Sequence, residues 1–422
     1  MTATTAGLKP AVPHAGMSFR QFVALIASLM AVSALGIDTM LPALATIGDS
    51  LHIKADNQRQ WIVTAYLLGM GVAQIVYGTL ADRYGRRPIL LAGLGLYVSF
   101  SIVAAFSQSF ETMLIARILQ GLGAAAARVL SVSIVRDCYS GRPMARVMSF
   151  SFIVFLAVPI LAPSLGEAIL LIAPWRAIFG VVAGFSLLIM VFVATRLPET
   201  LHPEDRMPIS PRRVGGAFKI VLTNRVAVGY TLALALIVGG MFSFLNSAQQ
   251  LFSDAFHAPR LFPVIFAFIA AFVAVASMLN ARVVGRLGMR LVSHAALVGY
   301  IAVAVLHAGF AVTGRETLVV FALLQASMMF CMGLVGSNFS AMAMEPLGHM
   351  AGTASSVQGF VTTVGGALIG IIIGQHFDGT AIPLTIGFAS LGSGAFLMVL
   401  ITEKGRMFKP TEAGIASAAG SS

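Results

Sequence analysis

The chain has 422 residues, of which 58% are hydrophobic and only 10% are charged, against roughly a quarter charged in soluble domains. This composition excludes an ordinary soluble enzyme. The formal net charge of +11 has no polar basic domain to carry it, which argues against nucleic acid as a partner. The two cysteines, Cys138 and Cys331, have neither disulfide nor metal-ligand spacing, so we expect small buried side chains and no metal or other cofactor.

Twelve apolar stretches follow one another along the chain, each long enough to span a membrane. Because hydrocarbon offers no hydrogen-bond partners to the backbone, these stretches are expected to be helices. A polar, Pro- and Arg-rich segment, 197–223, separates an N-terminal half (1–196) from a C-terminal half (224–422). The polar first 18 residues show no cleavable signal. The stretches are 21–45, 60–81, 88–107, 111–135, 147–172, 176–196, 224–250, 261–283, 290–311, 316–344, 350–375 and 381–402.

The basic residues are distributed unevenly between the loops of this predicted topology. If both termini are cytoplasmic, the cytoplasmic segments hold 20 of the 27 Lys and Arg residues, the outer loops five and the spans two. This is the asymmetry of the positive-inside rule. We therefore expect an all-α membrane protein with both termini in the cytoplasm.

The turn between the second and third stretches, GTLADRYGRRPIL (78–90), is the most specific motif. Its pattern G-x-L-A-D-R-x-G-R-R-P-x-L resembles the loop between helices 2 and 3 of the major facilitator superfamily. The resemblance implies a transporter with two six-helix halves and assigns gating roles to Gly78, Asp82, Arg83, Gly85, Arg86 and Arg87. A partly conserved repeat of this motif, which we call its degenerate copy, lies 203 residues later. There Arg286, Gly288 and Arg290 match Arg83, Gly85 and Arg87, and Gly285 stands in place of Asp82.

Four ionisable residues fall inside the predicted spans, and the first is Asp38. Such residues are costly in a membrane and usually functional. Small residues at helical spacing share the face of Asp38, which favours a protein-lined environment. The surrounding pattern L-G-x-D-x-x-L-P-A resembles the first helix of the Bcr/CflA drug-resistance branch of the superfamily. Asp38 is thus either a proton-binding carboxylate or a structural one, held in an ion pair or at the outer end of the span.

Two arginines lie eleven residues apart in the fourth span. Arg117, in R-x-x-Q-G-x-G-A-A, resembles the helix-4 signature of proton-coupled facilitators; the alternative is a buried Arg bonded to backbone carbonyls. By the same resemblance, Arg136 and Asp137 should join the loop 78–90 in a charge network that closes the cytoplasmic gate. Arg128 belongs to no recognised pattern. It either places a positive charge in an inward cavity, favouring neutral or anionic substrates, or extends toward the cytoplasm.

The fifth span contains VPILAPSLGEAILL, which resembles the helix-5 antiporter signature G-P-x-x-G-G, with Ala162 for the first Gly and Glu167 for the last. Pro159 and Pro163 are expected to bend the helix, and Gly166 to permit close packing. Glu167 is a candidate for proton coupling, for the rim of an outer cavity, or for pairing with Arg117.

Polar side chains of other spans are weaker candidates for the substrate cavity: Tyr66, Tyr77, Asn246, Gln249, Asn338 and Gln358. The resemblance implies a monomeric, multi-pass protein of the bacterial inner membrane that exports small amphipathic drug-like compounds in exchange for protons. The alternative is an uptake symporter or facilitator of the same superfamily. An enzyme is not expected, because no nucleophile–base spacing, phosphate loop or metal cluster is present.

Overall fold

The computed structural model describes residues 17–206 and 211–408, and all regular secondary structure in those residues is helical. Twelve helical segments are long and apolar enough to cross a membrane, which confirms the predicted number of spans. They are α1–α2 (Phe19–Asp38, Leu44–Ser50), α3 (Trp61–Tyr84), α4 (Arg86–Ala105), α5 (Phe110–Cys138), α6 (Gly141–Ile172), α7 (Arg176–Arg196), α9 (Arg225–Gln250), α10 (Phe262–Leu287), α11 (Met289–Val312), α12 (Leu318–Met344), α13 (Ala351–Gln375) and α14 (Ile382–Thr402).

The segment between the two halves contains a helix of its own. This helix is α8 (Pro211–Thr223), and a separate 3-10 turn, Pro203–Asp205, precedes it in the chain. Helix α8 contacts α9 and α13, and Phe218 meets Phe360 edge-on with ring centroids 6.3 Å apart. The polar composition predicted a linker but not this packed helix.

Two sharp turns mark one end of the helix bundle. Gly85 (φ 104°) ends α3 and begins α4, and Gly288 (φ 80°) does the same between α10 and α11. Positive φ values of this kind are adopted readily only by glycine. The motif and its degenerate copy therefore both keep the glycine that the turn requires. We call this end the Arg-rich end, after Arg83, Arg86 and Arg290, and the other the opposite end.

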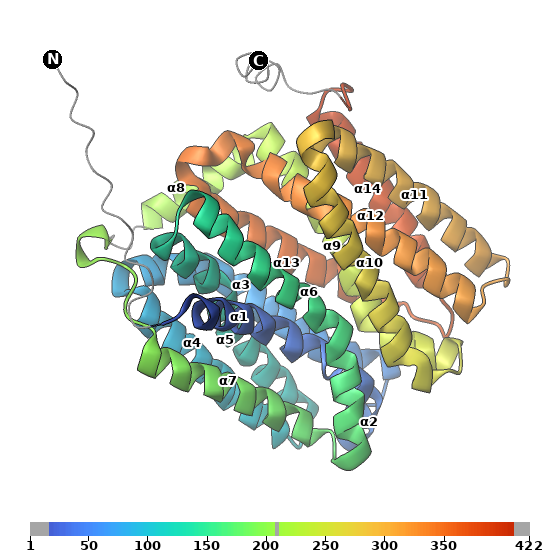
Figure 1. The fold of residues 1–422 in the computed structure, drawn as a ribbon. Helices are drawn as coiled ribbons and strands as arrows, with labels where there is room; N and C mark the ends of the chain where they lie inside the picture. Colours follow the sequence, from blue (N-terminus) through green and yellow to red (C-terminus); the bar gives the residue numbers. More distant parts are fainter. Residues whose placement is uncertain (1–16, 207–210, 409–422) are drawn as a thin grey trace.

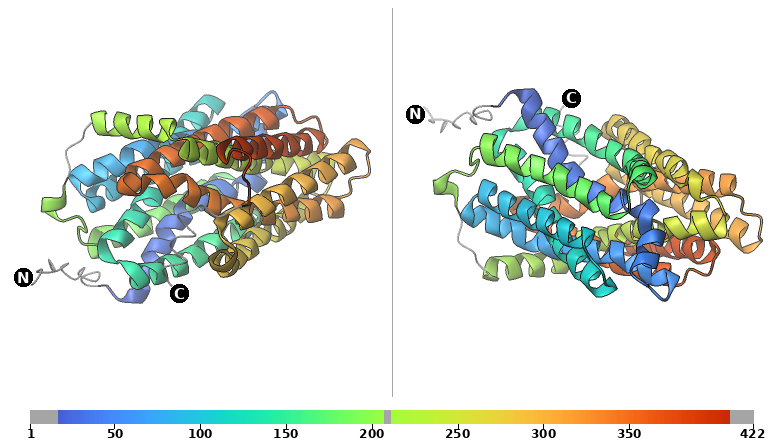
Figure 2. Two further views of the ribbon diagram at one scale, coloured as in Figure 1. Left: turned by 90° about the horizontal axis from the view of Figure 1, so that it is seen from above. Right: turned by 90° about the horizontal axis from the view of Figure 1, so that it is seen from below.

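Two helix pairs make most of the contact between the halves, α3 with α13 and α6 with α10. Glycines permit close approach of α3 and α13: a Cβ on Gly71 would lie 2.6 Å from the Val364 side chain, and one on Gly359 would overlap Gln74. Figures 1 and 2 show the blue-to-green half packed against the yellow-to-red half.

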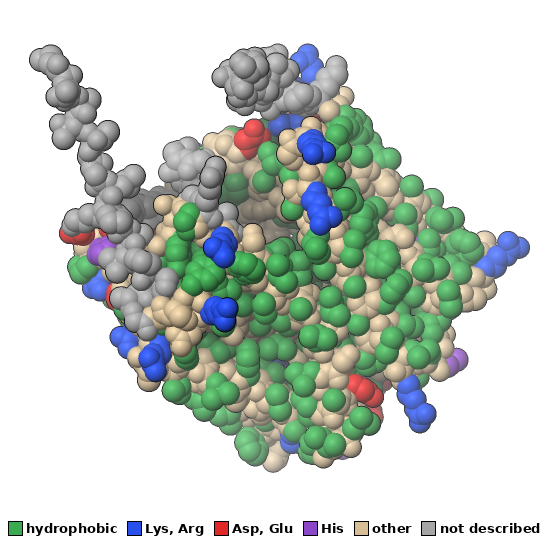
Figure 3. All heavy atoms as spheres, viewed as in Figure 1, with side chains coloured by type: hydrophobic (Ala, Val, Ile, Leu, Met, Phe, Trp, Pro, Cys, Tyr) green, Lys and Arg blue, Asp and Glu red, His purple; other side chains and the backbone are tan. Residues whose placement is uncertain are grey.

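The second pair, α6 and α10, lies together toward the opposite end and separates toward the Arg-rich end (Figure 1). Figure 3 shows the surface hollowed between these two helices at the Arg-rich end, and hydrophobic side chains covering most of the visible flank. The halves are therefore open to one another at the Arg-rich end, and the flank is suited to lipid.

Candidate transport site and gates

Asp38 lies where the first span changes helix type. Pro42 has no N–H, so it cannot donate to the carbonyl of Asp38, four residues earlier, and the α-helix gives way to a 3-10 turn, Leu41–Ala43. The Asp38 residue is only 5% exposed, and it is the only buried Asp or Glu in the described residues. Its carboxylate makes neither a hydrogen bond nor an ion pair with any described residue. The predicted structural ion pair is therefore not formed in this conformation.

The fifth span packs directly against this break. A Cβ on Gly166 would overlap the carbonyl oxygen of Thr39, the residue after Asp38, so only glycine permits this contact. Pro159 and Pro163 lie inside the continuous helix α6, and Ala162 is buried. The antiporter-like motif thus covers the Asp38 region. Glu167 is half-buried beside the contact and bonds to no described side chain, so it does not pair with Arg117.

Arg117 is fully buried, and its guanidinium is held by backbone carbonyls and an amide. It donates to the carbonyl oxygens of Ile62 (3.1 Å) and Gly36 (2.9 Å) and to the side chain of Gln120. The ring of Tyr66 stacks under it, with the guanidinium carbon 4.4 Å from the ring centroid. Arg117 therefore links the carbonyl of Gly36 in α1, two residues before Asp38, to the carbonyl of Ile62 in α3, and it forms no ion pair with a described carboxylate.

A buried polar cluster surrounds this arginine. The hydroxyls of Tyr66 and Tyr97 donate to α1 carbonyls at Ser33 and Val32, at 3.1 and 3.3 Å. A Cβ on Gly36 would lie 2.6 and 2.8 Å from the Tyr97 and Tyr66 oxygens. The glycine of the L-G-x-D pattern is thus required by the close approach of two phenols.

This cluster changes the interpretation of two tyrosines. Tyr66 is fully buried inside the N-terminal half and supports Arg117, so it does not line the cavity in this conformation. Tyr77 is half-buried, and its hydroxyl lies toward Gly93 on α4. The eleven-residue spacing placed the two on one face of α3, but the neighbouring helices cover that face.

Arg128 differs from Arg117 because its side chain is exposed. Its guanidinium interacts electrostatically with Tyr66, and it makes no hydrogen bond or ion pair with any described residue. An arginine within a span is expensive unless it meets water or a partner.

Hydrogen bonds between uncharged side chains, which we call the amide gate, join the halves at the opposite end: Asn57, Gln60 and Thr64 from one half and Asn246, Gln250 and Gln375 from the other. One ion pair, between Arg59 and Asp254 (3.8 Å), also crosses between the halves there. Asn57 donates to the carbonyls of Gln375 (3.1 Å) and Phe377 (2.9 Å) and accepts from Gln250 (2.7 Å). Gln60 donates to Gln250 (2.6 Å), and Asn246 donates to Thr64 (3.2 Å).

Four weak cavity candidates are placed differently from the prediction. Asn246 belongs to the amide gate, and Gln249 is buried and donates to Ser253 at 3.2 Å. Asn338 donates to Asn280 at 2.8 Å, and Gln358 accepts from Ser340 at 3.1 Å, both within the C-terminal half. In this conformation Asn246, Asn338 and Gln358 tie helices together, whereas Gln249 bonds within its own segment and its Oε1 has no partner among the described residues.

The loop motif builds a charge network at the Arg-rich end. The buried Arg86 pairs with Asp82 (2.6 Å) and with Asp137 (3.0 Å). Glu199, beyond α7, accepts from the backbone N–H groups of Arg86 (2.8 Å) and Arg87 (3.2 Å) and so caps the start of α4. The network stays within the N-terminal half.

Three other motif residues do not take part in these ion pairs. Arg83 is exposed near the Tyr84 ring, and Gly78 lies beside Ser356 of the other half. Arg136 is exposed and bonds to no described residue, so the expected contribution of Arg136 to the network is not seen.

The C-terminal half has an equivalent network that the sequence interpretation missed. Arg290, at the start of α11, pairs with Glu403 (3.0 Å) and Glu345 (3.6 Å). Tyr230 donates to Glu403 (2.6 Å) and bonds with His294 (3.0 Å). Gly285 stands where the first turn has Asp82, and the carboxylates that pair with Arg290 come instead from the ends of α12 and α14.

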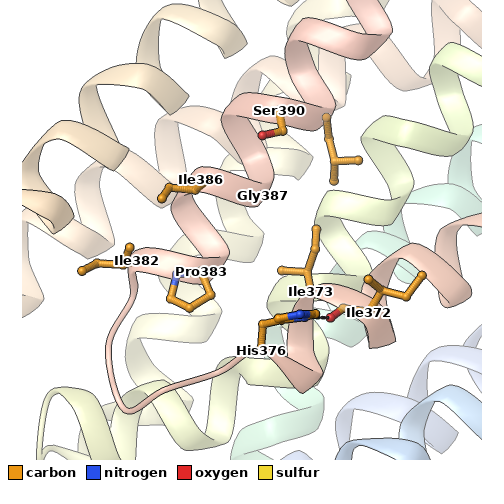
Figure 4. A pocket seen from close by; sticks show the side chains of 9 residues that line it. Ile372, Ile373, His376, Ile382, Pro383, Ile386, Gly387 and Ser390 are labelled. Atoms are coloured by element: carbon orange, nitrogen blue, oxygen red, sulfur yellow. Dashed lines mark hydrogen bonds between the residues drawn. The ribbon is translucent and has the colours of Figure 1, made fainter.

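One pocket of about 510 Å³ lies between α13 and α14 toward the opposite end. Figure 4 shows that its lining is mostly apolar, with the ring of His376 turned back to the carbonyl of Ile372. None of the polar groups described above lines it. The candidate transport site is therefore Asp38 and the hollow between the halves, not this pocket.

Comparison with known proteins identifies the architecture. The Major Facilitator Superfamily family model matches residues 26–370. The chain belongs to the major facilitator superfamily. This transporter is 32% identical over 383 residues to the uncharacterized MFS-type transporter YdgK of Bacillus subtilis, covering 88% of this chain and 93% of that protein.

Further relatives carry drug-resistance names, in agreement with the predicted Bcr/CflA branch. A bicyclomycin resistance protein homolog of Haemophilus influenzae is 28% identical, over 86% of this chain and 91% of that one. The multidrug resistance protein MdtL of Klebsiella pneumoniae is 30% identical over 52% of this chain and 55% of its own.

Solved structures share the fold of this transporter. The human organic anion transporter MFSD10 (TETRAN) matches with a TM-score of 0.66 and 19% identity, over 91% of this chain and 100% of that one. A D-xylose-proton symporter matches with a TM-score of 0.69 and 14% identity, over 90% and 97%. At these identities the likeness concerns the fold alone.

Proposed function

We propose that this transporter is a proton-coupled antiporter that exports small amphipathic compounds across a bacterial inner membrane by alternating access. The drug-resistance names of the relatives support export of such compounds. The positive-inside rule makes the Arg-rich end cytoplasmic. With the amide gate closed and the Arg-rich end open, the conformation described here is inward-facing.

The observation that carries the proposal is the buried Asp38 carboxylate without a partner. A buried charge without compensation is costly by several kcal/mol, so binding a proton to Asp38 changes the relative free energies of the conformations. Arg117 already donates to the carbonyls of Gly36 in α1 and Ile62 in α3 and to Gln120, and is not free to neutralise Asp38. Proton and substrate therefore compete for the inward-facing protein: substrate binds from the cytoplasm, and a proton from outside replaces it after the transition.

The conformational change requires the amide gate to open. Its hydrogen bonds join uncharged groups, and water can replace each lost partner, so the net cost is about 0.5–1.5 kcal/mol per bond. The partly exposed Arg59–Asp254 ion pair at the same end must also break, at a cost of about 0–1 kcal/mol. The Arg86 and Arg290 networks each remain within one half. Each half can then move as a rigid body. One proton entering across 100 mV supplies about 2.3 kcal/mol, before any pH gradient.

Acidified everted membrane vesicles test this function. Addition of neutral and anionic drugs should release protons from the vesicle lumen, monitored by a pH-sensitive dye. The Asp38→Asn variant should lose this release, and the Asp49→Asn variant, which changes an exposed residue of α2, should retain it.

The sign of the signal separates antiport from its rival. A symporter would move protons and substrate in the same direction, so added substrate would acidify the lumen further. Acidification, or release that Asp38→Asn leaves intact, would contradict the proposal.

A further inference from the structure

Arg128 is a charged side chain within a span that no part of the proposed proton mechanism uses. It is exposed, and no described side chain or carbonyl satisfies its guanidinium. By contrast, Arg117, on the same helix, is fully buried with three acceptors.

The position of Arg128 on α5 points it toward the hollow between the halves. Eleven residues bring a helix back to nearly the same face, ~16 Å further along at 1.5 Å per residue. That face of α5 meets α1 and α3, as the bonds of Arg117 to Gly36 and Ile62 show. The displacement is toward the Arg-rich end, where the halves separate and water enters.

No acidic side chain faces Arg128 in the middle of the described spans. In the C-terminal half, the charged residues of the described spans lie within about two turns of the helix ends. In the N-terminal half, Asp38 and Glu167 lie toward the opposite end, beyond Arg117. Within the described spans, the fixed positive charge of Arg128 therefore has no counter-ion beside it.

We propose that Arg128 binds an anionic group of the substrate, so that the preferred compounds are amphipathic organic anions such as aromatic carboxylates. A guanidinium matches the two oxygens of a carboxylate with two parallel hydrogen bonds. The same charge repels cationic drugs. This inference deepens the proposed function, because it names the substrate class of the same site.

The inference also fixes the charge moved in each cycle. Export of a monoanion in exchange for one proton moves two positive charges inward, whereas export of a neutral compound moves one. Transport of a carboxylate should therefore depend more steeply on membrane potential than transport of its neutral amide.

Equilibrium binding to the purified full-length protein tests the inference without requiring proton coupling. The probes are nalidixic acid, naproxen and indomethacin, each compared with its primary carboxamide. The variants are Arg128→Gln, Arg128→Lys and the control Arg282→Gln, which removes an exposed arginine near the Arg-rich end of α10. Thermal unfolding verifies that each variant is folded. The guanidinium of Arg128 makes no hydrogen bond or ion pair with a described residue, so its replacement should leave the unfolding temperature unchanged.

We expect at least one acid to bind tenfold or more tightly than its amide. Arg128→Gln should remove this preference and leave amide binding within twofold, Arg128→Lys should keep part of it, and Arg282→Gln should keep all of it. If no acid is preferred over its amide, or if the preference survives in Arg128→Gln, the inference is wrong. Loss of proton release with the acid preference intact would instead overturn only the proposed antiport.

Discussion

The amide gate makes a quantitative prediction for the replacement Asn57→Ala. This variant removes three hydrogen bonds between the halves, to the carbonyls of Gln375 and Phe377 and from the side chain of Gln250. At about 0.5–1.5 kcal/mol each, the closed gate loses about 1.5–4.5 kcal/mol relative to the open gate, where water serves as partner. Because about 1.4 kcal/mol is a factor of ten, the outward-open population should rise roughly ten- to a thousandfold.

A thiol in the gate reports this population. Thr64→Cys, with Cys138 and Cys331 replaced by serine, places a single thiol at a side chain that is now fully buried. A membrane-impermeant maleimide, applied to right-side-out vesicles, reaches this thiol only when the gate opens. The labelling rate should increase at least tenfold in the Asn57→Ala variant.

The matched control is Asn280→Ala, which also removes buried amide hydrogen bonds, but within the C-terminal half. It should lower the thermal stability without raising the labelling rate. Equal labelling in Asn57→Ala and its parent, in protein that remains folded, would refute the assignment of these amides to the gate.

Three further variants have definite outcomes. Arg86→Ala should destabilise the N-terminal half toward the low end of about 3–5 kcal/mol, because the partner Asp82 is partly exposed. Arg83→Ala should cost less than about 0.5 kcal/mol, and thermal unfolding compares the two variants. Gly36→Ala should cost about 1–3 kcal/mol by overpacking two phenols, measured by the same melts, and unchanged stability would show that α1 shifts freely. Gly166→Ala, against the backbone of Thr39, should impair transport and stability together, whereas Gly180→Ala, with open space around it, should change neither.

Hydropathy and the loop motif were sufficient to predict the spans and the family. Each span must form its backbone hydrogen bonds within its own helix, because the membrane offers no partners. Its length and apolar composition can therefore be recognised from the sequence alone. The loop 78–90 was equally informative, because Gly85 needs a positive φ and Arg86 needs local carboxylates. Asp137 was predicted correctly as one of them.

Contacts between distant segments were harder to predict. Glu199 and Glu403 follow the last spans of the two halves and support Arg86 and Arg290, but nothing local marks a loop carboxylate as a helix cap for another segment. Their equivalent positions in the two halves were the available signal. Likewise, whether a polar side chain such as Asn338 finds a hydrogen-bond partner within the C-terminal half or faces a cavity depends on which helices pack beside it. The residues around Asn338 in the sequence do not specify those neighbouring helices.

The central claim is that a proton and a substrate compete for the inward-facing transporter through Asp38. It is tested most directly by counting the protons released when substrate binds to the purified protein in a weakly buffered solution with a pH indicator. The account predicts release of up to one proton per substrate bound, lost in Asp38→Asn, whose substrate binding should no longer depend on pH. Binding without proton release in the wild type, or equal release in Asp38→Asn, would contradict it.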